Sequence, residues 1–583
     1  MKKHYETHVE DTDKLISVAG PVLDYKSWYE QYRKLTEEQA QRKHGLYTPT
    51  SEGDDDDFPS IPGMIARYSA LGLTNEQMAE NPVWKDLTGN GHDLQMKNFA
   101  WSGMSGVNGY KFDFLLNEWA TSNEQISEKY SYKIVINNKQ NSIQLINNSR
   151  HIKITLKITG IEINKSIFRV YDNAGKEHKQ DYTKDGIYEI DYTANEGANK
   201  IYFYVVGGNI GQLENPITIE QLPLYPGALV FDGVDDYGTC DNFPILTKEK
   251  GYTVVALRQW ITRGKGALGL VSNVKNWLKD GAFLLEYRNI QADHLNKPIS
   301  FGAIGSEMDL PHILTYQTSK SYNGVSITTG NFEGTDVLHV GKLAPTNVGT
   351  CINAAIWELV FLDHDATEEE LTKIKDYFVK TYPWLFPDQA WTVTGKTNED
   401  EDRATIANIT GNGNDLVLSN FGFAEGSGYN EEGEYAGYLV TDGVDDKAVS
   451  KQFKFGENFT VILDFKFPVK KISYCGFDLS SKVRIQNLQD SGVYVVLKGN
   501  KTLIPSNVVR AVTSEGKVYD ENWNEYNIVP GNISSNYTMV NLGFDGSIQF
   551  AESATKLAGI YSSTLSKDEC IKAYNYLQTL KAK

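Results

Sequence analysis

Two short sequence motifs, here called words, each occur twice in this chain. The number of residues between the first motif and the second differs between the two occurrences. The first word is TGNGHDLQMKNF at Thr88–Phe99 and TGNGNDLVLSNF at Thr410–Phe421, with eight of twelve positions identical. The second is DGVDD, at Asp232–Asp236 and again at Asp442–Asp446. Their starts are 144 residues apart in the first copy (232 − 88) and 32 apart in the second (442 − 410), a difference of 112 residues. Self-similarity of this kind indicates a repeated domain, so we expect two copies, the first carrying an inserted domain.

Each copy also ends in the same way, with an apolar strand-like run, a turn and the start of a helix. Both helix starts carry a capping box, Thr367 with Glu370 and Ser566 with Glu569, whose side chains satisfy the first free backbone N–H groups. We therefore expect one helix at the C-terminal end of each copy.

The remaining pattern is that of short strands joined by tight turns. The inserted segment holds six runs that alternate apolar and polar residues between turn signals: Tyr132–Asn137, His151–Ile158, Ser166–Tyr171, Gly186–Tyr192, Lys200–Val206 and Pro216–Leu222. Six or seven strands over about a hundred residues are typical of a small β-sandwich. The host copies have turn-bounded runs of the same kind, as expected for a two-sheet jelly roll.

The first 60 residues differ from the rest of the chain. Ser27–Lys43 has the capping and period of a helix, followed by a Pro-, Gly- and Asp-rich spacer at Pro49–Gly63. One face of this helix carries four apolar side chains: Trp28, Tyr29, Tyr32 and Leu35. A helix this short does not fold alone, so we expect its apolar face to dock on a partner protein, with docking on its own chain as the alternative.

Three longer segments in each copy, two of which overlap the repeated words, suggest a family. In the first copy these are Trp84–Asp93, Phe231–Tyr237 and Leu359–Leu371, and in the second Ile406–Asp415, Thr441–Lys447 and Ile560–Cys570. With these segments the copies resemble concanavalin A-like, laminin-G-like jelly-roll domains. The second copy departs from the pattern, since Ile406 stands for Trp84 and Lys447 for Tyr237.

The fold prediction is an all-β protein with two concanavalin A-like jelly-roll sandwiches, the first interrupted by a small inserted β-sandwich, plus an N-terminal helix and extended tether. The predicted boundaries are 1–60 for the tether, 61–116 and 225–385 for the first jelly roll, 117–224 for the insertion, 386–402 for a linker and 403–583 for the second jelly roll.

The layout as a whole resembles virion fibre or appendage proteins of phages that infect gut Bacteroidetes-type bacteria. This resemblance implies a non-enzymatic head or tail fibre or decoration protein, made in the host cytoplasm and assembled into the virion. It also implies other virion proteins as partners through the tether, a homo-oligomer, and jelly rolls that touch host surface glycans. A bacterial surface or secreted carbohydrate-binding lectin, or a polysaccharide hydrolase, is the alternative.

The composition of the chain argues against some classes of binding partner. The net charge is −18 with no basic stripe, which argues against nucleic acid. No segment is long and apolar enough to span a bilayer, and the N-terminus lacks the apolar region of a secretory signal peptide. The four cysteines are far apart and match no metal-ligand spacing, so we expect buried free thiols.

The repeated words have simple structural interpretations. The two glycines of TGNG permit a tight turn, and without a following Lys-Ser/Thr they form no phosphate loop. Asp-Gly in DGVDD is a hairpin signal, although its carboxylates also suit calcium. No cofactor is predicted; the alternative is calcium at Asp235 and Asp236, or at Asp445 and Asp446.

No catalytic residue is predicted. Hydrolases on this fold place Glu-x-Asp-x-(x)-Glu along one strand, so that two carboxylates flank the glycosidic bond. The nearest string runs from Glu189 through Asp191 to Glu196, but its last Glu is too distant and it lies in the insertion.

Sugar binding calls for exposed aromatic rings beside amide or carboxylate groups, because pyranose C–H faces stack on rings. Six residues in three loops fit this description, and the first four, in DENWNEYN, fit it best: Trp523, Tyr526, Asn522, Asn524, Trp277 and Trp101.

Overall fold

The structure is a computed structural model. It describes residues 57–115, 119–121, 128–136, 143–207, 213, 215–246, 249–262, 268–273, 284–287, 314–326, 335–342, 351–467, 474–480, 482–487, 493–532, 537–544 and 550–582. The predicted tether helix, with Trp28, Tyr29, Tyr32 and Leu35, lies outside the described residues, and so does Trp277.

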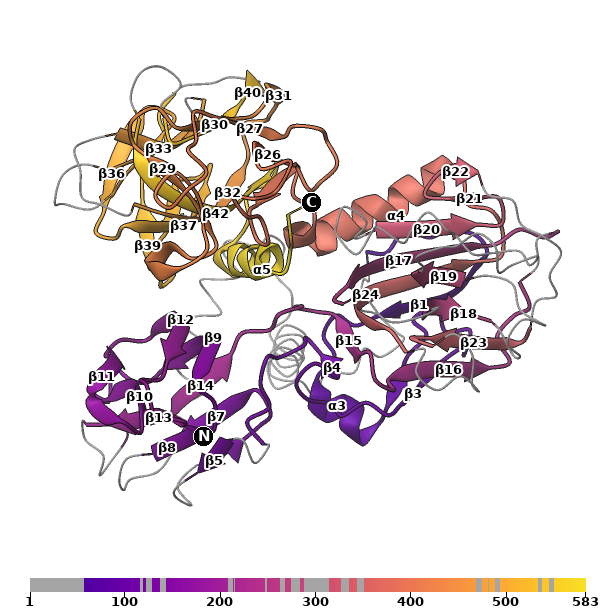
Figure 1. Ribbon diagram of the computed structural model, residues 1–583. Coiled ribbons are helices and arrows are strands. Elements are labelled where there is room, and N and C mark those ends of the chain that lie inside the picture. The colour runs from indigo at the N-terminus through magenta and orange to yellow at the C-terminus, as the bar shows by residue number, and fades with distance from the viewer. Residues whose placement is uncertain are drawn as a thin grey trace, which may run out of the picture.

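The first jelly roll is built from two antiparallel sheets (Figure 1). One sheet has the order β22-β21-β20-β17-β24-β15-β4, with β1 also paired to β24, and the other has the order β19-β18-β23-β16-β3-β2. The strands of the first sheet are β1 (Met64–Ser69), β4 (Gly106–Val107), β15 (Leu229–Asp232), β17 (Thr253–Trp260), β20 (Leu314–Thr318), β21 (Ser321–Tyr322), β22 (Val325–Ser326) and β24 (Asn353–Leu362). Those of the second are β2 (Val83–Trp84), β3 (Leu94–Lys97), β16 (Tyr237–Asp241), β18 (Leu268–Ser272), β19 (Leu284–Tyr287) and β23 (Val337–Val340).

The second jelly roll repeats this topology. Its sheets have the orders β28-β29-β42-β32-β37-β38-β39, with β25 on β42, and β26-β27-β30-β41-β33-β34-β35-β36. The strands of the first sheet are β25 (Gln389–Thr392), β28 (Gly428–Asn430), β29 (Tyr438–Asp442), β32 (Thr460–Lys466), β37 (Val508–Thr513), β38 (Lys517–Tyr519), β39 (Glu525–Asn527) and β42 (Glu552–Tyr561). Those of the second are β26 (Thr405–Ile406), β27 (Leu416–Ser419), β30 (Lys447–Val449), β33 (Tyr474–Leu479), β34 (Val483–Asn487), β35 (Val493–Leu497), β36 (Asn500–Ile504) and β41 (Val540–Leu542), and β31 (Phe453–Lys454) pairs with β40 (Tyr537–Thr538).

Strand order and hydrogen bonds both align the two copies. Each neighbour in the run β4-β15-β24-β17-β20 has its counterpart in β28-β29-β42-β32-β37. Thr253 in β17 and Thr460 in β32 occupy the same position. The Thr253 hydroxyl donates to the carbonyl of His364, just after β24, at 2.7 Å and accepts the N–H of Ala366. The Thr460 hydroxyl donates to the carbonyl of Ser563, just after β42, at 2.9 Å and accepts the N–H of Leu565. The predicted duplication is therefore confirmed in three dimensions.

The inserted segment forms a separate sandwich, here called the guest domain, of two five-stranded antiparallel sheets, β11-β10-β13-β8-β5 and β12-β9-β14-β7-β6. Its strands are β5 (Trp119–Thr121), β6 (Glu128–Lys129), β7 (Lys133–Ile136), β8 (Ile143–Asn147), β9 (His151–Thr159), β10 (Ile167–Asp172), β11 (Gly175–Tyr182), β12 (Gly186–Thr193), β13 (Ile201–Val206) and β14 (Ile217–Gln221). All six predicted strands are present. The polar strand β11 has too little apolar alternation to be recognised from its sequence.

Few helices interrupt the sheets in the described part of the chain. They are α3 (Asn75–Glu80), α4 (Glu368–Thr381) and α5 (Lys567–Gln578), with the 3-10 turns η3 (Pro383–Leu385) and η4 (Gly433–Tyr435). The capping boxes predicted for α4 and α5 are both formed. No helix among the described residues is long and apolar enough to cross a membrane.

The predicted linker 386–402 is wrong in part. Gln389–Thr392, within it, forms β25 and pairs with β42 as the counterpart of β1. Its residues are buried at every position, because the strand completes the helix-covered sheet of the second jelly roll. The polar Asp, Glu and Thr residues that suggested a linker lie on either side of this short strand.

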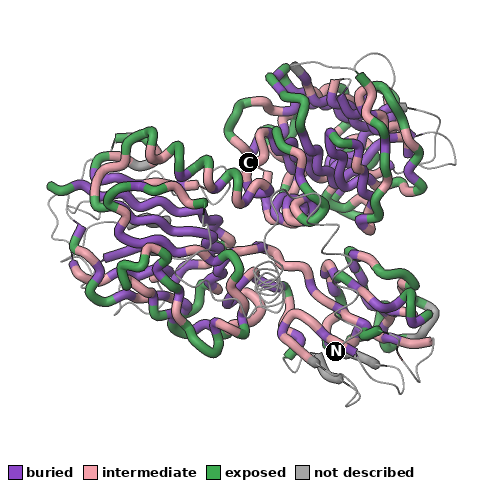
Figure 2. Tube along the Cα trace, turned by 180° about the vertical axis from the view of Figure 1, so that it is seen from behind, coloured by how far each residue is buried: buried purple, intermediate pink, exposed green. Residues whose placement is uncertain are grey.

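Three apolar cores fill the two jelly rolls and the guest domain, and the central strands of the sheets are buried along their length (Figure 2). A fourth cluster lies between the bodies. It joins Trp357 and Phe378 of the first copy to Trp523 and Tyr574 of the second, and Ile187 of the guest domain also belongs to it. Helix α5 lies at this junction, between the three bodies (Figure 1). All four cysteines are buried thiols that form no disulfide, as predicted.

Candidate functional site

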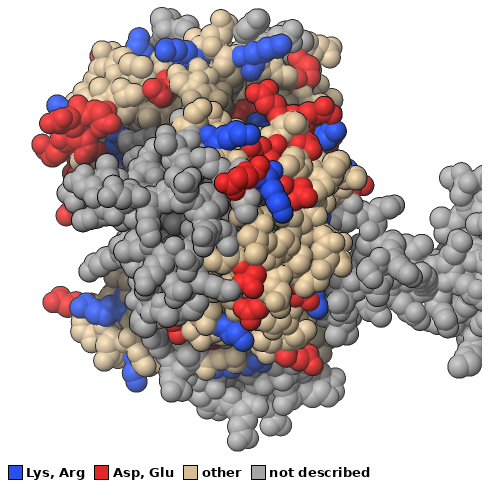
Figure 3. Space-filling model, turned by 90° about the vertical axis from the view of Figure 1, so that its right-hand side faces the viewer, with Lys and Arg blue, Asp and Glu red and all other residues tan. Residues whose placement is uncertain are grey.

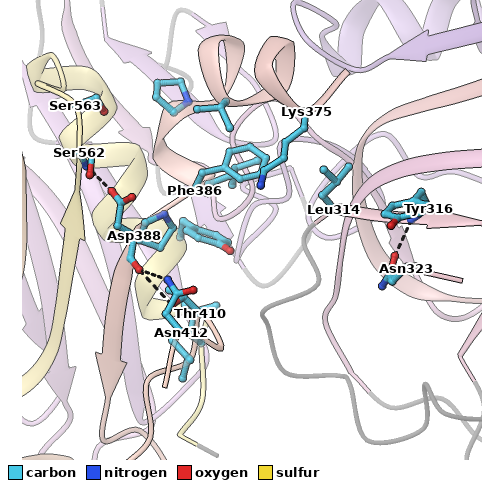
Figure 4. A pocket seen from close by; sticks show the side chains of 17 residues that line it. Leu314, Tyr316, Asn323, Lys375, Phe386, Asp388, Thr410, Asn412, Ser562 and Ser563 are labelled. Carbon is cyan, nitrogen blue, oxygen red and sulfur yellow. Dashed lines mark hydrogen bonds between the residues drawn. The ribbon is translucent and has the colours of Figure 1, made fainter. Parts of the chain in front are cut away.

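A cleft of about 600 Å³ lies between the two jelly rolls (Figure 4). Its walls come from β20 and α4 of the first copy, from the connection through η3, and from the second copy's TGNG turn, the end of β42 and the end of α5. The lining residues are Leu314, Tyr316, Asn323, Lys375, Val379, Pro383, Leu385, Phe386, Pro387, Asp388, Ile409, Thr410, Asn412, Ser562, Ser563, Tyr576 and Leu580. Both copies are thus needed to form it.

On the second-copy wall, the repeated TGNG word fixes the polar groups. Asn412 donates from its amide to the carbonyl of Asp388 at 2.6 Å, and the Thr410 hydroxyl donates to the same oxygen at 3.3 Å. The carboxylate of Asp388 accepts the N–H of Ser562. These bonds tie the turn, the start of β25 and the end of β42 together, so the wall is rigid before any ligand arrives.

The corresponding turn of the first copy has the same structural function. Asn90 donates to the carbonyl of Ile65 at 2.8 Å, and the Thr88 hydroxyl donates there at 3.3 Å. Gly89 and Gly91 have φ of +77° and +84°, as a tight turn of this kind requires. The turn interpretation of TGNG is confirmed. Only the second copy's turn lines the cleft between the copies.

The first-copy wall presents an aromatic ring, an amide and an ammonium group. Tyr316 is half-buried in β20, and its backbone N–H donates to the Asn323 side-chain oxygen at 2.9 Å, so this bond does not use the Asn323 amide nitrogen (Figure 4). Lys375 is exposed on α4. Phe386 adds a second half-buried ring from the connecting segment.

This combination suits a polar ligand with an apolar face. Tyr316 and Phe386 offer apolar surface, Asn323 and Lys375 offer donors, and Asp388 offers an acceptor, which is the set of groups that a saccharide uses. A volume of about 600 Å³ falls in the usual range for small-ligand pockets.

The same walls hold few groups that could catalyse hydrolysis. Of the described residues that line the cleft, only Asp388 carries a carboxylate, whereas glycoside hydrolysis ordinarily uses two. Glu189 and Asp191, from the string nearest to a hydrolase motif, lie elsewhere, on the guest domain. They form ion pairs with Lys153 at 3.4 and 3.1 Å.

The prediction of an exposed Trp523 platform is wrong. The indole is only 3% exposed and packs against Tyr574 of α5, with ring centroids 5.8 Å apart. Asp520 causes this: its carboxylate accepts the backbone N–H groups of Asn522 and Asn524, both at 2.9 Å, and the hydroxyl of Tyr526 at 3.0 Å. The polar residues of this loop therefore bind one another and turn the indole inward.

Trp101 belongs to a repeated local structure. It is half-buried and stacks on Phe99, with centroids 4.7 Å apart and planes 15° apart. Phe423 takes the same place in the second copy, near Phe421, so the aromatic residue is a feature of the repeat. Neither Trp101 nor Tyr526 lines the cleft.

Each DGVDD word forms a turn that carries the chain from one sheet of its jelly roll to the other, from β15 to β16 in the first copy and from β29 to β30 in the second. Asp236 is fully buried and accepts the N–H of Asp232 and the hydroxyl of Ser105, both at 3.0 Å. Asp446 is also fully buried and accepts the N–H of Asp442 at 2.9 Å. Burial raises the pKa of Asp236 to about 7 and that of Asp446 to about 6. The turn part of the prediction is confirmed, but the hairpin part is wrong, because β15 does not pair with β16 and β29 does not pair with β30.

These turns also have ligand atoms that fit a cation. Oxygens of Asp232, Asp235 and Asp236 lie within 4.8 Å of one another, and those of the second copy's three aspartates do likewise. Oxygen-only donors suit calcium. However, the buried carboxylates already close their own turns, so Asp235 and Asp445 are the ones that face solvent.

Sequence reasoning missed Tyr316, Asn323, Lys375 and Asp388. Each lies in an element that faces the other copy, and nothing local in the sequence distinguishes such a position from an ordinary exposed one. The repeated TGNG word was the one available signal, since it contains Asn412.

Comparison with known proteins gives no family for this chain. No family model matches, and no curated protein matches. Among solved structures, Trypanosoma rangeli sialidase in complex with sialic acid is 8% identical with a TM-score of 0.25, over 77% of this chain and 82% of that one. The receptor binding domain of botulinum neurotoxin mosaic serotype C/D is 13% identical with a TM-score of 0.23, over 32% of this chain and 50% of that one. The binding domain of Paraclostridial Mosquitocidal Protein 1 is 15% identical with a TM-score of 0.20, over 32% and 51%. This chain therefore spans about half the length of the two toxin domains, and at such scores these likenesses carry no functional argument.

Proposed function

We propose that this protein is a non-catalytic glycan-binding protein, and that it serves as a fibre or decoration of a phage virion. The observation that carries the proposal is the cleft between the two jelly rolls, with a rigid polar wall on one copy and a ring, an amide and a lysine on the other. The single carboxylate of its described lining favours binding over hydrolysis.

The virion assignment is supported by the sequence. Two similar sandwich domains in one chain suit an extended protein on the surface of a particle. The predicted tether in residues 1–60 could attach such a protein to the virion. Labelling purified virions with an antibody to the second jelly roll and viewing them by negative-stain microscopy tests this part. Labelled fibres or capsomers are expected, and unlabelled particles would contradict the assignment.

The glycan part is tested with two lysines of one helix. Lys375 lines the cleft, while Lys373, two residues earlier on α4, is exposed and pairs with Glu369 at 2.7 Å. The full chain is applied to an array of bacterial surface glycans, and the best-bound glycan is then titrated into wild type, Lys375→Ala and Lys373→Ala.

We expect Lys375→Ala to weaken binding about tenfold, the loss of one charge-assisted hydrogen bond, and Lys373→Ala to bind as wild type. Equal effects of both substitutions would place the glycan elsewhere. Release of reducing sugar during the titration would show an enzyme and contradict the non-catalytic assignment.

A further inference from the structure

A second pocket, of about 240 Å³, lies where the guest domain meets the second jelly roll. Its guest-side wall comes from β9, β12 and the segments that enter and leave the guest domain, and its other wall from β42 and α5. We call it the guest pocket. It is separate from the cleft between the jelly rolls, since α5 turns Tyr576 toward that cleft and Tyr574 and Gln578 toward the guest pocket.

Specific contacts hold the two walls together. Arg510 of the second jelly roll forms an ion pair with Glu189 of the guest domain at 3.3 Å, and the Tyr574 hydroxyl donates to the same carboxylate at 3.4 Å. Asn575 donates to the carbonyl of Pro223 at 3.5 Å. The pocket is therefore formed by a docked interface with its own polar contacts.

The walls of the guest pocket carry an excess of positive charge. Three lysines line it, Lys111, Lys153 and Lys556, against one carboxylate, Glu189. Lys153 already pairs with Glu189 at 3.4 Å and with Asp191 at 3.1 Å. This local excess contrasts with the net charge of −18 of the whole chain and with the interspersed charges on the face shown in Figure 3.

Two of these lysines form no direct ion pair within the described part of the chain. Among the residues that the structure describes, neither Lys111 nor Lys556 lies within ion-pair distance of a carboxylate. Burial lowers the pKa of Lys556; Asp464 and Glu189 oppose the effect, while Lys153 and Arg510 add to it. Loss of water around the Lys111 ammonium also lowers its pKa; Lys153 adds to the effect and Asp191 opposes it. Both ammonium groups are thus partly desolvated and repelled by the same neighbour, a situation that an anion would relieve.

We propose that the guest pocket binds a small oxyanion, the size of one carboxylate or sulfate group, between Lys111 on the guest side and Lys556 on β42. The amide of Gln578 lines the same wall; it donates one N–H to Asp464 at 2.9 Å and has a second N–H that can donate to the anion. Two sources share this chemistry, a free inorganic anion and the acidic group of a sugar. The pocket binds its anion whether or not the cleft between the jelly rolls binds a glycan.

Isothermal titration of the full chain at constant ionic strength tests the proposal. The probes are sodium sulfate, sodium glucuronate and, as a neutral counterpart, glucose. The variants are Lys111→Gln, whose side chain is exposed, and Lys556→Gln; the control is Lys97→Gln, an exposed lysine of β3 that lines neither pocket.

We expect saturable binding of sulfate or glucuronate with one site per chain, and no binding of glucose. Each pocket variant should bind about tenfold more weakly, as expected when one charge-assisted bond is lost, while Lys97→Gln should bind as wild type. Tighter binding of glucuronate would identify an acidic sugar as the source, and tighter binding of sulfate a free anion. If neither anion saturates, or if Lys111→Gln and Lys556→Gln both bind as wild type, the proposal is wrong. Because Lys111 is exposed, its variant keeps the test decisive even if Lys556→Gln fails to fold.

Discussion

The two jelly rolls share their strand order but bury their charges at different places. In the first copy, Arg67 of β1 pairs with Glu358 of β24 at 3.0 Å, and both are almost fully buried. The hydroxyls of Tyr377 and Tyr382 bond to the same pair, each at 2.8 Å. The guanidinium also lies 4.1 Å from the ring centroid of Phe58, at the start of the described chain.

In the second copy, the buried pair is Asp464 of β32 with Arg510 of β37. Tyr574 and Gln578 of α5 donate to the Asp464 carboxylate at 3.4 and 2.9 Å. Burial alone would raise the pKa of Asp464, but Arg510 beside it holds the pKa at about 2. On its far side Arg510 reaches Glu189 of the guest domain.

Each copy has uncharged residues where the other has its ion pair. By strand register, Ala390 and Leu557 stand where the first copy has Arg67 and Glu358. Leu257 and Thr315 likewise stand where the second copy has Asp464 and Arg510. The fold therefore needs neither pair. Each pair occurs where a segment that the other copy lacks docks, the N-terminal segment in one case and the guest domain in the other.

The largest expected effect comes from breaking the second pair. Arg510→Met leaves the Asp464 carboxylate buried without its partner, which typically costs about 3–5 kcal/mol. Asp464→Leu/Arg510→Thr, which introduces the first copy's residues, should cost less than Arg510→Met alone. Differential scanning calorimetry of the full chain measures both.

The matched exchange in the first copy is Arg67→Ala/Glu358→Leu. It should also be milder than Arg67→Met alone. If either double variant is less stable than its single variant, the fold needs the pair itself, and the difference between the copies has another origin.

A second difference concerns the pH dependence of the two DGVDD turns. The pKa values of Asp236 and Asp446, about 7 and about 6, lie above the ordinary value of about 4. The folded state therefore holds protons that the unfolded state releases, so stability is lost as pH rises from about 4 through 6 and 7. The decline is about 3 kcal/mol for Asp446 and about 4 kcal/mol for Asp236, from about 1.4 kcal/mol per pKa unit. Melting temperatures between pH 4 and 8 should fall less for Asp236→Asn than for wild type.

Calcium binding offers a second test of the two DGVDD turns. If the three aspartates of a turn hold Ca²⁺, the ion must displace the proton of the buried carboxyl group. Added CaCl₂ should then raise the melting temperature more at pH 8 than at pH 5, and less in Asp236→Asn. No calcium effect at pH 8 would mean that both turns are structural only.

Much of the fold could be predicted from the sequence, because its signals are local. The capping boxes reflect hydrogen bonds within a few residues, the TGNG glycines reflect the backbone angles of one turn, and the alternating runs reflect which face of a strand is buried; all reappear in the structure. Strand β25 was missed because a four-residue buried strand between polar residues carries little periodicity.

The candidate site could be predicted far less well. The burial of Trp523 depends on Asp520 drawing the loop closed and on Tyr574 of α5, about 50 residues away. Tyr316 and Asn412 meet only because two copies pack together. Contacts of this kind depend on how whole domains dock, which composition and spacing do not encode.

The smallest expected effect concerns the TGNG turns. Asn90→Ala and Asn412→Ala each remove hydrogen bonds from a side-chain amide to backbone carbonyls, and each should cost about 1 kcal/mol. Chemical denaturation should show similar losses for the two, because the turn has the same function in both copies. Only Asn412→Ala should also weaken glycan binding, since only that turn lines the cleft.

The most direct test of the central claim is an experimental structure of the full chain with its best-bound glycan. We predict a saccharide in the cleft between the jelly rolls, in contact with Tyr316 or Lys375 of the first copy and with Asp388 or Asn412 of the second-copy wall. A saccharide held by one jelly roll alone, with the cleft unoccupied, would contradict the claim that the duplication creates the binding site.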